Sequence, residues 1–454
     1  MTWEVCLRRS EFQPKPNPCY RTIPESSIIK LLLLVSWACE IDAGDRPAAQ
    51  AATSAALESW VGSGLGYRVD DDGQRLFDPV EVINFLKWAG LTGSDRYWND
   101  HFVATHRRFV RAFRAEQGGA WPGVATPRRF RVKLRRSFDL RGFAEGASVR
   151  LRLPLPLVGA YLDDLHVTPV VPAVFERDAI LRDQCIELRL KVSDNRMITI
   201  GADFLFTAQD PGGRSLLLTS PLSAHEAELY CRKSEGLIQV TSRIETLAAE
   251  LGRHCTSAES TVAAFWAFMM DELCSGMIRY GDVPAAAPGD WVLDHGWYDC
   301  QLGSALLVSL CRARGIPARI VSGHCLYRVQ PISHYWSEIW LDGFGWCPFD
   351  VICWDLSRGG QDRAWRDVFA GRMDYRLVTQ CFPLVFTGPM SLRFPRTWHM
   401  VQLAAEGGIE TTYTDAEDGS LIYRDHVAVE NLGPTEREAS IAGLPHQRPP
   451  AGCV

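Results

Sequence analysis

Three residue types suited to nucleophilic catalysis occur in one short part of the chain: a thiol, an imidazole and a carboxylate. Cys300 comes first, His334 follows 34 residues later, and Asp350 follows after a further 16. A thiolate attacks acyl carbonyl groups, an imidazole can take the proton of the thiol, and a carboxylate can hold the imidazole in one tautomer. If the fold brings the three side chains together, they predict acyl chemistry through a covalent thioester.

The thiol stands where a helix is expected to begin. Asp299 is a typical N-cap, and the apolar residues within 301–314 recur with helical spacing. Gly315 suits the left-handed position that ends a helix, and Pro317 follows it. A thiol in the first turn faces backbone N–H groups and the positive end of the helix dipole, which both favour the thiolate. We therefore expect Cys300 to be activated by its position.

Strand patterns follow this helix. Residues 318–322 form one expected strand, and residues 334–341 form a second in which side chains alternate between two faces. An Asp-Gly turn then leads into a third short strand over 344–350. Because consecutive strands joined by a tight turn lie side by side, we expect Asp350 to return beside His334.

These motifs resemble the transglutaminase-like core of the papain-like superfamily. Four motifs follow one another in the family's order: Asp-Cys300, Leu-Cys-Arg-Ala-Arg-Gly-Ile-Pro-Ala-Arg319, His334-Tyr-Trp-Ser-Glu and Gly-Trp-Cys-Pro-Phe-Asp350. The resemblance covers residues 237–354 and implies Cys300 as nucleophile, His334 as general base and acid, and Asp350 as the orienting carboxylate. It also implies a papain-like α+β fold in which the Cys helix packs on an antiparallel sheet.

The resemblance leaves two outcomes of the acyl chemistry open. An amine that reaches the thioester gives acyl transfer (amide formation or transamidation), whereas water makes the same triad a cysteine peptidase or amidase. We expect acyl transfer through Cys300, with a peptide, protein or carrier-bound acyl substrate and an amine acceptor. A non-catalytic binding module is the third alternative. No cofactor is expected, and no calcium-loop spacing occurs, so the calcium dependence of some animal transglutaminases is not carried over.

Several neighbouring residues compete for these roles. His324 and His295 are alternative bases, although the family's arrangement favours His334. Asp299 is expected to cap the helix rather than to act as an acid, and Cys311, near the negative end of the helix dipole, is expected to lie in the core.

An oxyanion also needs hydrogen-bond donors. The backbone N–H of Cys300 is one natural donor. Trp291, Trp297 and Tyr298 all lie close enough in sequence to supply a second, and the sequence does not choose among them.

Composition narrows the class of protein. Hydrophobic residues make up 46% and charged residues 22% of the chain, the formal charge is −6 and the pI is about 6.0, which argues against general nucleic-acid binding. The 14 cysteines include no Cys-x-x-Cys pair and no His/Cys cluster with structural-zinc spacing. Neither His254-Cys255 nor His324-Cys325 is expected to bind a metal. We expect reduced thiols and a cytoplasmic location.

The N-terminal region, residues 1–125, is predicted to be helical. Expected helices cover 28–39 and 48–60, another begins at Asp78-Pro79, and a fourth covers 96–114. The apolar run over 28–39 is shorter than the roughly 20 residues that a membrane span needs, and no secretory signal is evident. No membrane partner is expected, and the region is interpreted as packing on the core or gating substrate entry.

A β-rich, sandwich-like domain is predicted over residues 126–232. Regularly spaced strands are expected at 130–135, 149–153, 186–192 and 198–206.

The transglutaminase-like catalytic domain, with a C-terminal extension, is predicted over residues 233–432. Its early helices are expected to start at capping boxes, Ser242–Glu245 and Thr256–Glu259. Short strands beyond Asp350 are expected to complete its sheet. The residues 433–454, rich in Pro, Gly and charge, are predicted to be a disordered tail.

Overall fold

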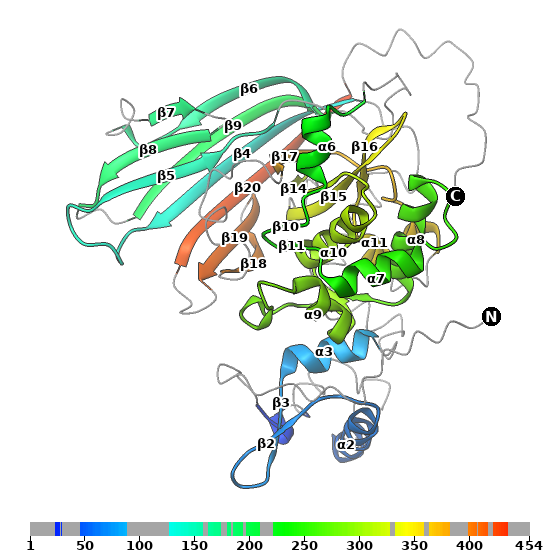
Figure 1. The fold of residues 1–454 in the computed structure, drawn as a ribbon. Coiled ribbons are helices and arrows are strands. Elements are labelled where there is room, and N and C mark those ends of the chain that lie inside the picture. Colours follow the sequence, from blue (N-terminus) through cyan, green and yellow to red (C-terminus); the bar gives the residue numbers. More distant parts are fainter. Residues whose placement is uncertain are drawn as a thin grey trace.

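Most of the chain can be described in three parts. Figure 1 shows a β-rich part in which cyan and red strands lie side by side, a mixed part in green and yellow, and an N-terminal part in blue. The computed structural model describes residues 23–27, 29, 46–88, 127–157, 162–173, 179–182, 185–193, 197–208, 221–326, 332–357, 363–381, 398–405, 407–415 and 421–434.

A four-stranded antiparallel sheet forms the centre of the mixed part, in the order β16-β15-β14-β17. Its strands are β14 (Ala318–Cys325), β15 (Ser333–Leu341), β16 (Gly345–Phe349) and β17 (Arg376–Cys381). The first three confirm the strands and the hairpin predicted from the sequence. The fourth is a strand beyond Asp350 that completes this sheet, also as expected.

The helix α10 (Cys300–Ala313) packs on this sheet and is the most deeply enclosed element of the mixed part. Every residue from Gln301 to Arg312 is buried, because the sheet covers one side of the helix and other helices cover the rest. Gly315 follows its C-terminus with φ +70°, a conformation that glycine adopts without a steric cost. The mixed α+β arrangement, with the Cys helix on an antiparallel sheet, is therefore as predicted.

Three helices surround α10: α7 (Ser242–Leu251), α8 (Ala258–Asp271) and α9 (Pro288–His295). The predicted capping boxes were wrong by one residue. Thr241 caps α7, and Ser257 caps α8 in a capping box that uses Ser260 in place of Glu259. A serine hydroxyl at the third position can reach back to the cap N–H, so the glutamate is not needed there.

Short elements complete the mixed part. They are α6 (Ala224–Tyr230), β10 (Ser234–Glu235), β11 (Ile238–Gln239), β12 (Cys274–Ser275), a 3-10 turn at Tyr280–Asp282, β13 (Trp297–Tyr298), α11 (Cys353–Leu356) and α12 (Arg363–Arg366).

The β-rich part contains two sheets. The larger has the strand order β18-β19-β20-β4-β9-β6 and the smaller has the order β5-β8-β7, with antiparallel pairing throughout. Their bounds are β4 (Arg128–Asp139), β5 (Ser148–Pro154), β6 (Leu162–Val170), β7 (Ala179–Arg182), β8 (Cys185–Lys191), β9 (Met197–Ala208), β18 (Trp398–Ala405), β19 (Gly408–Asp415) and β20 (Leu421–Pro434).

The last strands of the chain join the larger sheet of the β-rich part and do not extend the four-stranded sheet of the mixed part. The strand β20 pairs with β4 along most of its length, and the pairing ends at Pro434 opposite Arg128. Residues up to 432 are predicted to form the catalytic domain with its C-terminal extension; the structure pairs the last of them with β4, and Gly433 and Pro434, predicted to begin the tail, still belong to β20. The physical reason is that β4 carries backbone N–H and C=O groups along both edges. The strand β9 provides hydrogen-bond partners for only one of these edges, and β20 pairs with the other. Residues 435–454 lie outside the described residues.

The β-rich and mixed parts share one contiguous hydrophobic core, whereas the N-terminal part has a small core of its own. The N-terminal part consists of β1 (Ile23–Pro24), α2 (Arg46–Gly62), β2 (Arg68–Val69), β3 (Arg75–Phe77) and α3 (Pro79–Trp88). The helices predicted at 48–60 and from Asp78 onwards are thus confirmed; residues 96–114 and, apart from Ile29, residues 28–39 fall outside the described residues. Within the described ranges, no helix is both long and apolar enough to cross a membrane.

Candidate active site

The loop before α10 places the nucleophile. The two residues of β13 pair in parallel with β12, which fixes the chain just before the helix. Asp299 then caps α10, as predicted: its Oδ1 accepts hydrogen bonds from the backbone N–H groups of Gln301 (3.0 Å) and Leu302 (2.9 Å). Cys300 is the first residue of the helix and is half-buried.

A tyrosine that the sequence reasoning missed holds the same cap. The hydroxyl of Tyr280 donates to both carboxylate oxygens of Asp299 at 2.8 Å. Burial raises the pKa of Asp299, although the two backbone N–H groups and Tyr280 oppose this shift. Tyr280 stands in a turn without a recognisable motif, so only the structure connects it with the thiol.

The second and third predicted residues meet as expected. The Nε2 atom of His334, on β15, lies 2.9 Å from each carboxylate oxygen of Asp350, which directly follows β16. Both side chains are buried, His334 at 5% exposure and Asp350 at 0%. Because Asp350 engages Nε2, Nδ1 is the ring nitrogen left for exchange of a proton with a thiol.

The thiol lies beside the strand that carries His334. The backbone N–H of Tyr335, the next residue along β15, donates a hydrogen bond to the Cys300 sulfur, which favours the thiolate. Burial nevertheless raises the pKa of Cys300 well above its usual range, and the carboxylates of Asp299 and Asp350 raise it further. Burial and these two anions therefore act against the thiolate, whereas the Tyr335 N–H and the start of the helix favour it.

Asp350 stays ionised despite its burial. Burial raises the pKa of this carboxyl, but His334 and Arg376, together with the backbone N–H of Ile352, hold it below its usual value. The Nη2 atom of Arg376 lies 3.0 Å from Asp350 Oδ2, and the Ile352 N–H donates to Oδ1 at 2.9 Å. Arg376 begins β17, more than twenty residues after the last motif, and no local pattern pointed to it.

The comparison with known proteins agrees with this geometry. Residues 245–351 match the family model of the transglutaminase-like superfamily, and this range contains Cys300, His334 and Asp350. The chain contains a transglutaminase-like domain.

Three similar solved structures can be compared with the whole chain. A candidate cysteine protease from Cytophaga hutchinsonii is 13% identical, with a TM-score of 0.43, and the match covers 68% of this chain and 92% of that one. The periplasmic domain of TgpA from Pseudomonas aeruginosa is 17% identical, with a TM-score of 0.30, covering 56% and 96%. A candidate protease from Parabacteroides distasonis is 11% identical, with a TM-score of 0.22, covering 66% and 70%. The search of curated proteins finds no match.

Within the transglutaminase-like domain, the alternative bases have other surroundings. The Nδ1 atom of His295 lies 2.7 Å from the carbonyl oxygen of Trp291, and its ring stacks on that indole. His324 is buried at 6% exposure, and its pKa is lowered to about 4, mainly by burial and also by Arg136. The structure thus places His334, and neither of these, in contact with Asp350.

The remaining candidates near the thiol are resolved only in part. Cys311 is fully buried within α10, which confirms that it belongs to the core. Among the proposed oxyanion donors, the hydroxyl of Tyr298 already donates to the Met269 carbonyl at 3.3 Å. Trp291 and Trp297 are buried beside the loop, and the choice of a second donor stays open.

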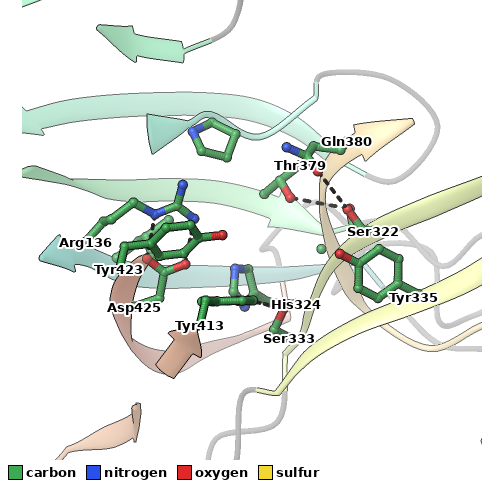
Figure 2. A pocket seen from close by; sticks show the side chains of 13 residues that line it. Arg136, Ser322, His324, Ser333, Tyr335, Thr379, Gln380, Tyr413, Tyr423 and Asp425 are labelled. Carbon is green, nitrogen blue, oxygen red and sulfur yellow. Dashed lines mark hydrogen bonds and ion pairs between the residues drawn. The ribbon is translucent and has the colours of Figure 1, made fainter. Parts of the chain in front are cut away.

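A small polar cavity lies between the four-stranded sheet of the mixed part and the larger β-rich sheet (Figure 2). Its volume is about 30 Å³, which suffices for about two water molecules. Ser333 and Tyr335, the neighbours of His334, both line it, and the Tyr413 hydroxyl donates to the Ser333 Oγ at 3.0 Å. The other polar lining residues are Arg136, Ser322, His324, Thr379, Gln380, Tyr423 and Asp425.

A metal site was not expected, and the described ranges contain no group of three or more His, Cys, Asp or Glu residues that could hold an ion.

Proposed function

We propose that this protein is a thiol enzyme that transfers acyl groups through a thioester on Cys300, with His334 as base and acid and Asp350 as the orienting carboxylate. The observation that carries the proposal is the contact of His334 Nε2 with both oxygens of Asp350 on the strand beside the Cys300 thiol. A buried imidazole–carboxylate pair next to a thiol at a helix start is the arrangement that nucleophilic catalysis needs.

The first half of the reaction forms the thioester. His334 Nδ1 takes the thiol proton as the Cys300 sulfur attacks the acyl carbonyl carbon. The new C–S bond forms, the bond from that carbon to the leaving group breaks, and the imidazolium returns the proton to the leaving group. Asp350 keeps Nε2 protonated and stabilises the imidazolium while it exists.

The second half of the reaction releases the acyl group. An acceptor attacks the thioester carbon, gives its proton to His334 Nδ1, and displaces the Cys300 sulfur, which regains that proton. The raised pKa of Cys300 fits this cycle, because the thiol is then ionised only when the base is used.

Acyl transfer to an amine is our first candidate for the second half of the reaction, because an amine that reaches the thioester before water gives an amide. Hydrolysis as a peptidase or amidase uses the same three residues and is the second candidate. The donor we propose is a peptide, protein or carrier-bound acyl compound, and the acceptor is an amine.

Intact-mass spectrometry tests the proposal. The protein is incubated with glutaminyl peptides, other peptides and acyl thioesters, with and without a primary amine. The expected result is an acyl adduct on wild type and on Cys311→Ala, and none on Cys300→Ala. Cys311→Ala is the matched control because it removes a thiol from the same helix.

The fate of the adduct decides between the two reactions. Release as an amide when the amine is present supports acyl transfer, and release only as the free acid would assign a hydrolase. If no donor gives an adduct and every cysteine reacts equally with a thiol reagent, the proposed catalysis fails and the domain is a binding module.

A further inference from the structure

Asp350 is one member of a buried row of charges that continues away from the thiol. Arg376 contacts Asp350 at 3.0 Å, and its Nε donates to Asp374 Oδ1 at 2.6 Å. Arg376 and Asp350 are 0% exposed and Asp374 is 1% exposed. The order is therefore carboxylate, guanidinium, carboxylate and imidazole, leading towards Cys300.

The guanidinium is held in one place by its surroundings. Its central carbon lies 5.2 Å from the ring centre of Trp336 and 5.3 Å from that of Phe369. Trp336 is on the same strand as His334, and Arg376 sits where β17 pairs with Cys325 of β14. Contacts with two carboxylates and two aromatic rings leave the side chain little freedom to turn away from Asp350.

Stability alone is a poor explanation for this arrangement. Removing three charges from water is costly, and a buried ion pair often contributes no more to stability than apolar side chains of similar size. A guanidinium also remains charged at every relevant pH. Arg376 therefore places a permanent positive charge against Asp350, the carboxylate of the proposed triad.

We propose that Arg376 is a positioning residue of the thiol centre, whose charge keeps Asp350 ionised and sets the pH at which the centre takes up a proton. This inference rests on the proposed function. When His334 is neutral, before the attack, Arg376 is the full positive charge in contact with Asp350. A proton that binds to the thiol, imidazole or carboxylate is repelled by that charge, whichever of them receives it.

The consequence is measurable without a substrate. Loss of the charge raises the proton affinity of the centre, so that the reactivity of Cys300 is lost at a higher pH as the solution is acidified. The readout is the rate of alkylation of Cys300 by iodoacetamide, an uncharged reagent, followed by peptide mass spectrometry between pH 4 and pH 9. Arg376→Met combined with Asp374→Asn removes both charges of the outer pair, which limits the cost to folding.

The acid limb of this profile is the range in which the alkylation rate falls as the pH drops. The double variant is expected to move the acid limb to higher pH, by about one unit. Arg376→Lys retains the charge and is expected to stay close to wild type. The matched control is Arg136→Met with Asp425→Asn, because these residues form another buried bidentate pair, at 2.7 Å, that does not contact Asp350. This control is expected to lose stability without moving the acid limb.

Each contrary outcome has a definite meaning. An unmoved acid limb in a folded double variant, or an equal shift in Arg376→Lys, would overturn the role of the charge. Unfolding of the double variant while the control folds would assign Arg376 to structure alone. If wild-type Cys300 reacts no faster than the other cysteines, the proposed function itself fails; selective labelling with no shift rejects only the role of Arg376.

Discussion

Asn84, on the N-terminal helix α3, forms two hydrogen bonds with the backbone of Met277. Its Nδ2 donates to the Met277 carbonyl at 2.8 Å, and the Met277 N–H donates to its Oδ1 at 2.9 Å. The side chain thus makes the pair of hydrogen bonds that the backbone of a neighbouring strand would make with Met277. Asn84 is fully buried, and Met277 lies just beyond β12, the strand that pairs with the loop before Cys300. The N-terminal part is therefore attached directly to the segment that supports the active-site loop.

Asn84→Ala should loosen this attachment. The variant leaves a backbone donor and acceptor without their partners, which costs about 1–3 kcal/mol of unfolding free energy. Denaturant unfolding measures the loss, and hydrogen exchange should be faster at the Met277 amide. Asn84→Asp keeps the acceptor for that amide, so it should retain more of the protection at Met277. Equal protection in wild type and Asn84→Ala would show that the contact is not maintained in solution.

Cys300 should be labelled selectively by iodoacetamide in the folded protein. It is half-buried beside the strand that carries His334, whereas Cys311, Cys325 and Cys353 are fully buried. Peptide mass spectrometry should detect modification of Cys311 only after unfolding, and Cys300→Ala should leave the labelling of the other cysteines unchanged. Labelling of Cys311 at the rate of Cys300 under native conditions would contradict the burial described for α10.

Asp350→Asn should slow turnover, on the order of 10⁴-fold where the carboxylate sets the imidazole tautomer. The amide carries no charge to stabilise the imidazolium, and its NH2 group can donate to Nε2 and hold the other tautomer. Asp342→Asn is the control, because Asp342 is an exposed residue of the hairpin turn that joins β15 to β16. The rates are compared once a donor has been found by adduct formation. A normal rate in Asp350→Asn would remove this residue from the triad.

The contact of His334 with Asp350, and its place beside the start of the Cys300 helix, were predictable because the signals are local. A cap, a helix and a tight hairpin each leave a pattern within about 15 residues, and together they place Cys300, His334 and Asp350. The pKa of the thiol was not predictable in this way. It depends on how completely the fold covers Cys300 and on two carboxylates, the adjacent Asp299 and Asp350, which faces the thiol from another element.

The contacts that were missed join distant segments. Arg376 reaches Asp350 from β17, on the opposite side of β14 from the hairpin, and β20 reaches β4 after most of the chain has intervened. Alternating hydrophobicity identifies such strands but does not say which edge each one joins.

His324 should make the protein less stable in acid. Its pKa is lowered to about 4 in the folded state, from an ordinary value of 6.5, mainly by burial. The unfolded chain therefore binds a proton that the folded chain does not, and stability falls as the pH drops from about 6.5 to about 4, by about 3 kcal/mol in total.

The test of this pH dependence compares His324→Gln with wild type. Between pH 7 and pH 5, the unfolding free energy of wild type should fall by about 2 kcal/mol more than that of His324→Gln. His254→Gln is the control, since His254 is exposed. The same pH dependence in wild type and His324→Gln would mean that His324 is not held neutral by the fold.

Gly323→Ala should separate β17 from β14. A Cβ atom at this position would lie 1.9 Å from the Leu377 carbonyl oxygen, a backbone atom of β17 that cannot move without breaking the pairing of the two strands. Because β17 also carries Arg376, the variant should lose both stability and the contact that holds Asp350. The expected cost is above about 3 kcal/mol, the range of large steric and packing defects. Gly281→Ala is the control, because nothing lies within 4 Å of its added Cβ. Thermal and denaturant unfolding should separate the two variants clearly; if Gly323→Ala is as stable as Gly281→Ala, β17 does not pair with β14 as described.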